Sequence, residues 1–385
     1  MPWKTESAME QRLKFVIEKH GGKETMTGLC RRYGVSRKTG YKWLDRYETE
    51  GTIAALNDMT RRPHRSPRRT SVDREQRVLR VRDEKGWGAE KIQHVVAREG
   101  LQLPAITIHR ILKRNGRIAR EDRTRLATGR FERENCNELA QMDFKGEYRL
   151  EGGSKCYPLS FLDDCSRYLL GLWPLGSVSA NGVHEVLKDH FKRVGVPQEI
   201  LTDHGSTWYA NTSKHGLTWL SVWLIKQGIT LKYSGVRHPQ TQGKVERFHG
   251  TLKRRTKHRG EPVTLSEWKT WAQEFREEYN CERPHAALGM KTPAEVYTMD
   301  NLRPYQEHPP EWDYGGGEVR KLDNDGGFTR NGSYYHVCEA LAKEHVRTDE
   351  FDGKITVTFR HLTIREIDLQ TRRSTAVLLR SELQN

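Results

Sequence analysis

The spacing of apolar residues first indicates a helix-turn-helix near the start of the chain. Residues 25–51 carry apolar positions at helical spacing on both sides of Gly34, and glycine suits a sharp turn because it readily adopts a positive φ. Ser36 is a good N-cap for the second helix, and Val35 is expected to fill the angle between the helices. Gly40 disagrees, because glycine inside a helix costs about 1 kcal/mol relative to alanine.

A second helical pattern of the same kind occupies residues 88–115, with one apolar face around Ile92 and another around Ile108. Its connecting turn is longer and less stereotyped. Between the two patterns, residues 60–70 hold several arginines, two prolines and no acid, so a helix cannot run through them. This arm fits either the minor groove of DNA or a solvated linker.

Residues 135–300 alternate apolar runs with amphipathic stretches, which predicts an α/β domain. The predicted order is three strands, helix, strand, helix, strand, helix. Asp143 lies within the first strand, Asp203 ends the fourth, and Glu246 lies at the start of the last, basic helix. Such a sheet can bring these three carboxylates together, and divalent cations would offset their repulsion. Two Mg²⁺ ions about 3.5–4 Å apart, or Mn²⁺ in their place, would activate an attacking oxygen and stabilise a leaving one.

Asp163 and Asp164 compete with Asp143 for the first position, since they are adjacent acids at a strand end. They precede a predicted turn, where a capping role and an ion pair with Arg167 account for the presence of both acids. Asp143 is preferred because it lies within the first strand.

The overall charge points to a polyanionic partner. Lys and Arg number 66 against 51 Asp and Glu, a formal net charge of +15, which favours nucleic acid over a merely solubilising surface. No apolar run reaches the length of a membrane span, and the first residues lack a secretory signal. The six cysteines lie far apart, which argues against a zinc site or a disulfide framework and favours a reducing cytoplasm.

Two motifs resemble a known family. They are HPQTQGKVERFHGTLK at 238–253 and YNCERPHAALGMKTPAEVY at 279–297. Here the chain resembles the insertion-sequence transposases that have a retroviral-integrase-type core, whose fold is RNase H-like, and the resemblance covers roughly residues 25–300. His204 stands where the family usually has Asn, and the interval between Asp203 and Glu246 is longer than usual. The extra length is expected within 208–220.

The resemblance implies that Asp143, Asp203 and Glu246 form a catalytic, metal-binding triad. It further implies cleavage at the 3′ ends of a mobile element, strand transfer into target DNA, and a homo-oligomer on double-stranded DNA that binds the terminal inverted repeats. The predicted DNA contacts are Arg37, Lys38, Thr39 and Lys42 in the first pattern, Arg61, Arg62, Arg65, Arg68 and Arg69 in the arm, Arg110, Lys113 and Arg114 in the second pattern, and Lys244 and Lys253 near Glu246.

The end of the chain predicts short strands. Asn331-Gly332 and Asp352-Gly353 are hairpin signals, and a small β-barrel is expected. It would either contact DNA through Arg330, Tyr334 and His336 or serve as a packing module. The expected domains are a first helix-turn-helix (1–59), an Arg/Pro-rich linker (60–70), a second helical DNA-binding domain (71–125), the RNase H-like core (126–302), a linker (303–318) and the barrel (319–385).

Two rival functions use the same features. A repressor without enzymatic activity would use the same helices, but it would not need the acids at 143 and 203. A nuclease acting on one strand would need the acids, but not tandem readers and an arginine arm.

Overall fold

The computed structural model describes residues 7–59, 69–118, 132–210, 216–234 and 243–377. It contains two compact units, which divide between Thr70 and Ser71. No helix in the described ranges is long and apolar enough to cross a membrane. Most of the arginine-rich arm lies outside these ranges.

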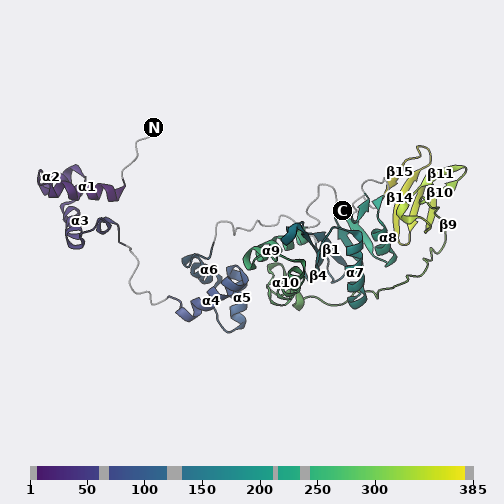
Figure 1. Ribbon diagram of the computed structural model, residues 1–385, viewed down its shortest axis with the longest axis horizontal. Coiled ribbons are helices and arrows are strands. Elements are labelled where there is room, and N and C mark those ends of the chain that lie inside the picture. The colour runs from purple at the N-terminus through teal and green to yellow at the C-terminus, as the bar shows by residue number, and fades with distance from the viewer. Residues whose placement is uncertain (1–6, 60–68, 119–131, 211–215, 235–242, 378–385) are drawn as a thin grey trace. The chain divides into compact units, whose positions relative to one another are not determined.

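The first unit is helical (Figure 1). Its described elements are α1 (Ala8–His20), α2 (Met26–Arg32), α3 (Arg37–Glu50) and the short 3₁₀ turn η1 (Ile53–Leu56). The turn between α2 and α3 has the predicted features, since Gly34 has a φ of 64° and the Oγ of Ser36 accepts the backbone N–H of Thr39 at 3.1 Å. The prediction for Val35 is wrong: this side chain is 36% exposed, and Phe15, Leu29 and Trp43 contribute to the core instead.

Gly40 is buried inside α3. A Cβ at this position would lie 2.7 Å from the Sγ of Cys30 and 2.9 Å from the Cζ of Phe15. The close approach of α3 to the other helices therefore requires a glycine, which accounts for a residue that helix propensity alone disfavours.

The second unit begins with three further helices, α4 (Val72–Lys85), α5 (Ala89–Arg98) and α6 (Ala105–Arg114). Ile92, Val96, Ile108 and Ile111 are almost fully buried between them. The two predicted apolar faces thus meet in one small core, with α4 as the third helix.

A mixed sheet of six strands forms the centre of the second unit. Its strands are β1 (Leu139–Phe144), β2 (Tyr148–Arg149), β3 (Lys155–Asp163), β4 (Leu169–Leu175), β5 (Glu199–Thr202) and β8 (Thr230–Tyr233). β1 pairs antiparallel with β3 and parallel with β5, and β5 pairs parallel with β8. The parallel connections run through α7 (Ala180–Val194) and α8 (Trp219–Lys226). The predicted order of strands and helices is present, with the short strands β2, β6 and β7 in addition to it.

Helices cover both faces of this sheet (Figure 1). Phe161 of β3 belongs to the apolar cluster of α7 and α8, and its neighbour Leu162 belongs to that of α9 (Gly243–Arg259) and α10 (Leu265–Glu277). This alternation is the two-residue period of a strand that is buried on both sides. After α10 the chain makes short turns, which are η5 (Glu278–Glu282), η6 (Ala286–Leu288) and η7 (Pro293–Glu295).

The segment between Asp203 and α8 contains two short strands, β6 (Tyr209–Ala210) and β7 (Gly216–Leu217). They pair antiparallel with each other and with no strand of the six-stranded sheet. They lie within 208–220, where the sequence places the extra length.

The C-terminal strands form an open sheet, so the predicted β-barrel is corrected. Five of them, in the order β15-β14-β13-β12-β9, form an antiparallel sheet, and β10 and β11 pair only with each other among the described residues. One face of this sheet is buried in the same apolar cluster as the core, so closure into a barrel is not needed to cover it. The strands are β9 (Glu318–Lys321), β10 (Gly327–Arg330), β11 (Ser333–His336), β12 (His345–Phe351), β13 (Lys354–Phe359), β14 (Leu362–Asp368) and β15 (Ser374–Ala376), with η8 (Glu339–Leu341) between β11 and β12.

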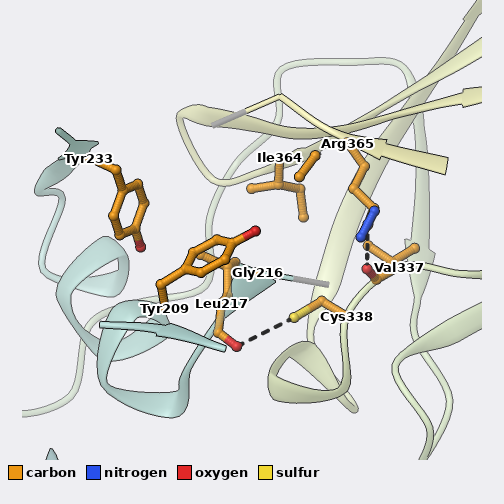
Figure 2. A pocket seen from close by; sticks show the side chains of 9 residues that line it. Tyr209, Gly216, Leu217, Tyr233, Val337, Cys338, Ile364 and Arg365 are labelled. Atoms are coloured by element: carbon orange, nitrogen blue, oxygen red, sulfur yellow. Dashed lines mark hydrogen bonds between the residues drawn. The ribbon is translucent and has the colours of Figure 1, made fainter. Parts of the chain in front are cut away.

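The six-stranded core contacts the C-terminal sheet, and this contact is here named the apolar seam (Figure 2). The core contributes β6, β7, α8 and β8. The other side consists of η8, β14 and the residues around Cys338. The Sγ of Cys338 lies 3.9 Å from the carbonyl oxygen of Leu217, and the Nε of Arg365 donates to the carbonyl of Val337 at 2.6 Å. The cavity left between them is about 10 Å³, so the seam is nearly closed.

Candidate active site

The pairing of β1 with β5 brings two of the predicted acids to one edge of the sheet. Gln141 is in register with Leu201, so Asp143 and Asp203 are the residues two positions further along neighbouring parallel strands. The carboxylate of Asp203 accepts the backbone N–H of Gly205 at 2.9 Å, which orients it at the end of its strand. These two acids are therefore brought together by backbone pairing.

The start of α9 is attached to the same strand. The backbone N–H of Val245 donates to the Oε1 of Gln141 at 3.2 Å, and the Nε2 of Gln141 donates to buried Asp164 at 2.8 Å. Lys244 forms an ion pair with the same Asp164 at 2.5 Å, so its ammonium is committed inside the protein. Glu246 lies in this first turn of α9 and is exposed.

The pKa of Asp143 is affected by both of the other acids. Burial, followed by the charges of Asp203 and Glu246, raises this pKa to about 7 against the lowering effects of the Phe144 N–H and Lys145. Because burial and like charges favour the protonated form of a carboxylate, Lys145 and the Phe144 N–H do not fully compensate the charges of the three acids.

The three side chains supply only oxygen donors, which Mg²⁺ and Mn²⁺ prefer. Among the described residues, no three acidic, imidazole or thiol side chains already lie in ligating positions. The donor chemistry and the raised pKa of Asp143 nevertheless fit a cation, because a cation would remove the repulsion that the three acids exert on one another.

His249 and Ser160 belong to the site and were missed by the sequence analysis. His249 follows Glu246 by one helical turn, its Nε2 lies 2.9 Å from the Oγ of Ser160, and its Nδ1 lies 3.6 Å from Asp143. Ser160 pairs directly with Asp143 across β1 and β3. Burial and the nearby charge of Lys145 lower the pKa of His249 to about 3, so the imidazole is neutral at pH 7. The only signal was the position of His249 within the ERFHG motif.

The competing pair of acids has structural partners. Asp163 accepts the backbone N–H of Asn137 and of Ser166, each at 2.8 Å, which is the predicted capping role. Arg167 forms its ion pair with Glu132 at 2.7 Å and bonds Asp164 only through the backbone carbonyl of that residue, so the predicted ion pair is wrong.

The predicted DNA contacts fall into three groups. Exposed residues are Arg37, Lys38 and Lys42 on α3, Arg69 in the arm, Arg110 and Lys113 on α6, and Lys253 on α9. Partnered residues are Thr39, whose Oγ1 lies 2.9 Å from the Oγ of Ser36, Arg114, which pairs with Glu75, and Lys244. Arg61, Arg62, Arg65 and Arg68 lie outside the described residues.

Family models match both parts of this architecture. The integrase core domain matches residues 133–239 and 227–293, and homeodomain-like domains match residues 9–56 and 39–112. Residues 133–293 are thus similar to integrase core domains and are here named the integrase core, and the helices before them are similar to homeodomain-like domains. The resemblance to insertion-sequence transposases is confirmed.

Relatives of the integrase core come from insertion elements. The chain is 25% identical over 235 residues to an uncharacterized 31.7 kDa protein of insertion element IS407 from Burkholderia multivorans, covering 58% of this chain and 82% of that protein. It is 29% identical over 210 residues to the putative transposase InsD of insertion element IS2E from Escherichia coli, covering 50% of this chain and 92% of that protein.

Solved structures that match include the HTLV-2 integrase catalytic core domain in complex with magnesium, at 14% identity and a TM-score of 0.34, covering 43% of this chain and 99% of that one. A second is a chain of the simian T-cell lymphotropic virus intasome in complex with a PP2A regulatory subunit, at 14% identity and a TM-score of 0.37, covering 78% of this chain and 98% of that one.

Proposed function

We propose that the chain is a DNA transposase that binds the ends of a mobile element and joins them to target DNA at Asp143, Asp203 and Glu246. One geometric observation supports this proposal. The parallel pairing of β1 with β5 brings Asp143 and Asp203 to one edge of the sheet, and the Val245 N–H at the start of the helix that carries Glu246 donates to Gln141 of β1. A cluster of this kind is unfavourable alone and favourable around divalent cations.

The triad would hold two Mg²⁺ ions, or Mn²⁺ in their place. When bound, these ions would supply charge stabilisation to both the attacking and the leaving oxygen. Asp143 is fixed on a central strand and Asp203 is oriented by the Gly205 N–H, so both contribute rigid donors. Glu246 is exposed at the start of α9, where its side chain can turn toward the other two.

The reaction has two in-line displacements. First, the oxygen of a water molecule bonds to phosphorus at the element's end, and the bond from that phosphorus to the 3′ oxygen breaks, leaving a free 3′-OH. That 3′-OH then attacks a phosphodiester of the target. A new P–O bond forms, a target P–O bond breaks, and the released 3′ oxygen takes up a proton. The number of phosphodiester bonds is unchanged in the second step, so no nucleotide hydrolysis is required.

The helical units would hold the DNA in place. The exposed basic residues at the start of α3 and on α6 lie where recognition helices meet bases and phosphates. Two element ends must be held together, so the active form would be a homo-oligomer on double-stranded DNA with inverted repeats.

An end-joining assay with Mg²⁺, on duplexes taken from the DNA that flanks the coding sequence, tests this proposal. Asp143→Asn, Asp203→Asn and Glu246→Gln should each abolish joining. Asp189→Asn is the matched control, since Asp189 is an exposed acid on α7 that pairs with Arg193 at 2.7 Å, and it should join at the wild-type rate. Joining by all three triad variants would refute the proposal.

Binding of the ions has its own readout. Mg²⁺ should raise the melting temperature of the wild-type protein, because a ligand that binds only the folded state stabilises it. The same titration of Asp143→Asn should give a smaller rise.

A further inference from the structure

The helical unit α4–α6 contacts the integrase core through polar groups, and this contact is here named the polar seam. The Nζ of Lys91 on α5 donates to the carbonyl of Pro284, and Arg98 pairs with Glu295 at 2.7 Å. Lys85 at the end of α4 pairs with Glu282 at 2.7 Å. One face of α5 therefore lies against residues 284–295 of the core.

Four basic side chains gather at this seam. Lys91 comes from α5, Arg254 from α9, and Arg283 and His285 from the segment after α10; they are here named the cation cluster. Arg254 is exposed, and the other three are half-buried, so the cluster can be reached from solvent. In the described part of the chain, no ion pair within 4.0 Å joins any of the four to a carboxylate.

The acids nearest to the cluster already have partners. Glu278 pairs with Arg255 at 2.5 Å and lies 3.8 Å from Lys85, and Glu295 pairs with Arg98. Glu90 is exposed beside Lys91 and only partly offsets its charge. The cluster is therefore an excess of positive charge in a partly desolvated place, which is unfavourable unless an anion compensates it.

Two donors in the cluster also lack partners. The Nε of Arg283 and the Nε2 of His285 are buried and form no hydrogen bond. The ring of His285 is held edge-on to Tyr279, with 4.9 Å between the ring centroids, so its position is fixed. Buried polar atoms usually form a hydrogen bond, so two neighbouring buried atoms without one indicate a place where a ligand can bind.

The charges of these groups act on one another and lower the pKa of two of them. Burial, followed by the charges of Arg283 and Arg254, lowers the pKa of Lys91 to about 7. Burial, followed by Lys91 and Arg283, lowers the pKa of His285 to about 2, so its imidazole is neutral and has one N–H to donate.

We propose that the cation cluster binds one phosphodiester group of duplex DNA between α5 and the integrase core. The anion would accept from the guanidinium of Arg283, the ammonium of Lys91 and the imidazole of His285, with Arg254 at the exposed side. This inference rests on the proposed function, because it takes DNA as the partner. It adds a DNA contact between the helices α4–α6, where α6 carries the exposed Arg110, and the integrase core, where α9 carries Glu246.

The salt dependence of binding by the full-length protein tests the inference. The logarithm of the affinity for a duplex of arbitrary sequence falls linearly with the logarithm of salt concentration, by about 0.9 for each neutralised phosphate. Lys91→Met and Arg283→Met should each reduce this slope by about 0.9. The conservative variants Lys91→Arg and Arg283→Lys should restore it, which a purely structural role would not predict. Arg193→Met, an exposed charge on α7, should keep the wild-type slope.

Wild-type slopes for both Lys91→Met and Arg283→Met would overturn the inference. Lys91→Met is the safer variant to fold, because Lys91 lies at the seam rather than in a core, and its melting curve can be checked directly. The outcome is separate from that of the proposed function. Unchanged slopes together with triad-dependent joining would reject the cation cluster alone, whereas reduced slopes with triad-independent joining would reject the proposed chemistry alone.

Discussion

The integrase core meets its two neighbours within the second unit through opposite kinds of contact. At the apolar seam, Leu217, Leu341 and Ile364 are buried in one continuous apolar cluster. At the polar seam, the contacts are hydrogen bonds and ion pairs, and one of the ion pairs, Arg98 with Glu295, has side chains that are 50% and 41% exposed. Apolar burial is nearly insensitive to salt, whereas exposed ion pairs are worth little and are screened.

This difference indicates which neighbour is a fixed part of the core. The C-terminal sheet shares the core's apolar cluster and should unfold with it. The helical unit α4–α6 has its own small core around Ile92 and Ile108, and its contacts to the integrase core are of a kind that a DNA phosphate can replace. We therefore expect any movement on DNA binding to occur at the polar seam.

The largest effect is expected from Leu341→Ala at the apolar seam. Leu341 is fully buried in η8, which packs against α8, so truncation should lower the free energy of unfolding by about 2–5 kcal/mol. In urea unfolding followed by tryptophan fluorescence, to which the core contributes buried Trp208 and Trp268, the transition of the core should shift to lower urea concentration. Phe351→Ala is the control, because this residue of the same sheet is 85% exposed and should change stability little. An unshifted core transition in Leu341→Ala would mean that the sheet folds independently.

The sequence predicted the individual helices and strands better than it predicted how the C-terminal strands pair. Apolar spacing is local, so α2 and α3 were expected within residues 25–51, and the alternation of strands and helices in the core was expected as well. The barrel was not correct, because closure depends on which distant strands pair, and one face of the open sheet is covered by the core instead. The HPQTQGKVERFHG motif pointed to Glu246, but the contact of His249 with Ser160 joins a helix to a strand and leaves no periodic signal.

Gly40→Ala tests whether tight apolar packing determines the stability of the first unit, as we expect it to do at the apolar seam. A methyl group at this position would meet Cys30 and Phe15 at less than ordinary contact distance. The overpacking cost of about 1–3 kcal/mol should exceed the gain in helix propensity of about 1 kcal/mol. Gly250→Ala in α9 is the matched control, since its nearest atom would be 3.9 Å away, and it should be neutral or stabilising. Equal melting temperatures for the two variants would contradict this packing argument.

Because Lys91 lies at the polar seam and has a lowered pKa, the free energy of unfolding should depend on pH. Its pKa is lowered from 10.5 to about 7 in the folded protein, so between these values the unfolded chain binds a proton that the folded chain does not. Stability should therefore rise with pH across this window, by no more than about 1 kcal/mol per pH unit. The groups that face Lys91 are Glu90 on its own helix and Arg254, Arg283 and neutral His285 from the core.

Melting curves at pH 7 and pH 9 check this dependence. Lys91→Met should lose the part of the rise that Lys91 contributes, while Lys113→Met, an exposed lysine on α6, should keep the wild-type rise. An identical rise in wild type and Lys91→Met would show that Lys91 remains protonated throughout.

The smallest effect is expected from Lys85→Ala, and it separates the two seams most directly. Lys85 joins α4 to Glu282, whose side chain is 50% exposed, and such a partly exposed pair is worth about 1 kcal/mol. Glu278 keeps its closer partner Arg255 at 2.5 Å, so the melting temperature should move little. Hydrogen exchange should be more sensitive, with faster exchange of the amides in 278–295 at low salt. At about 1 M salt, where the screening length is near 3 Å, wild type and variant should exchange alike. A difference that persists at high salt would mean that the polar seam, like the apolar one, is held by packing rather than by charge.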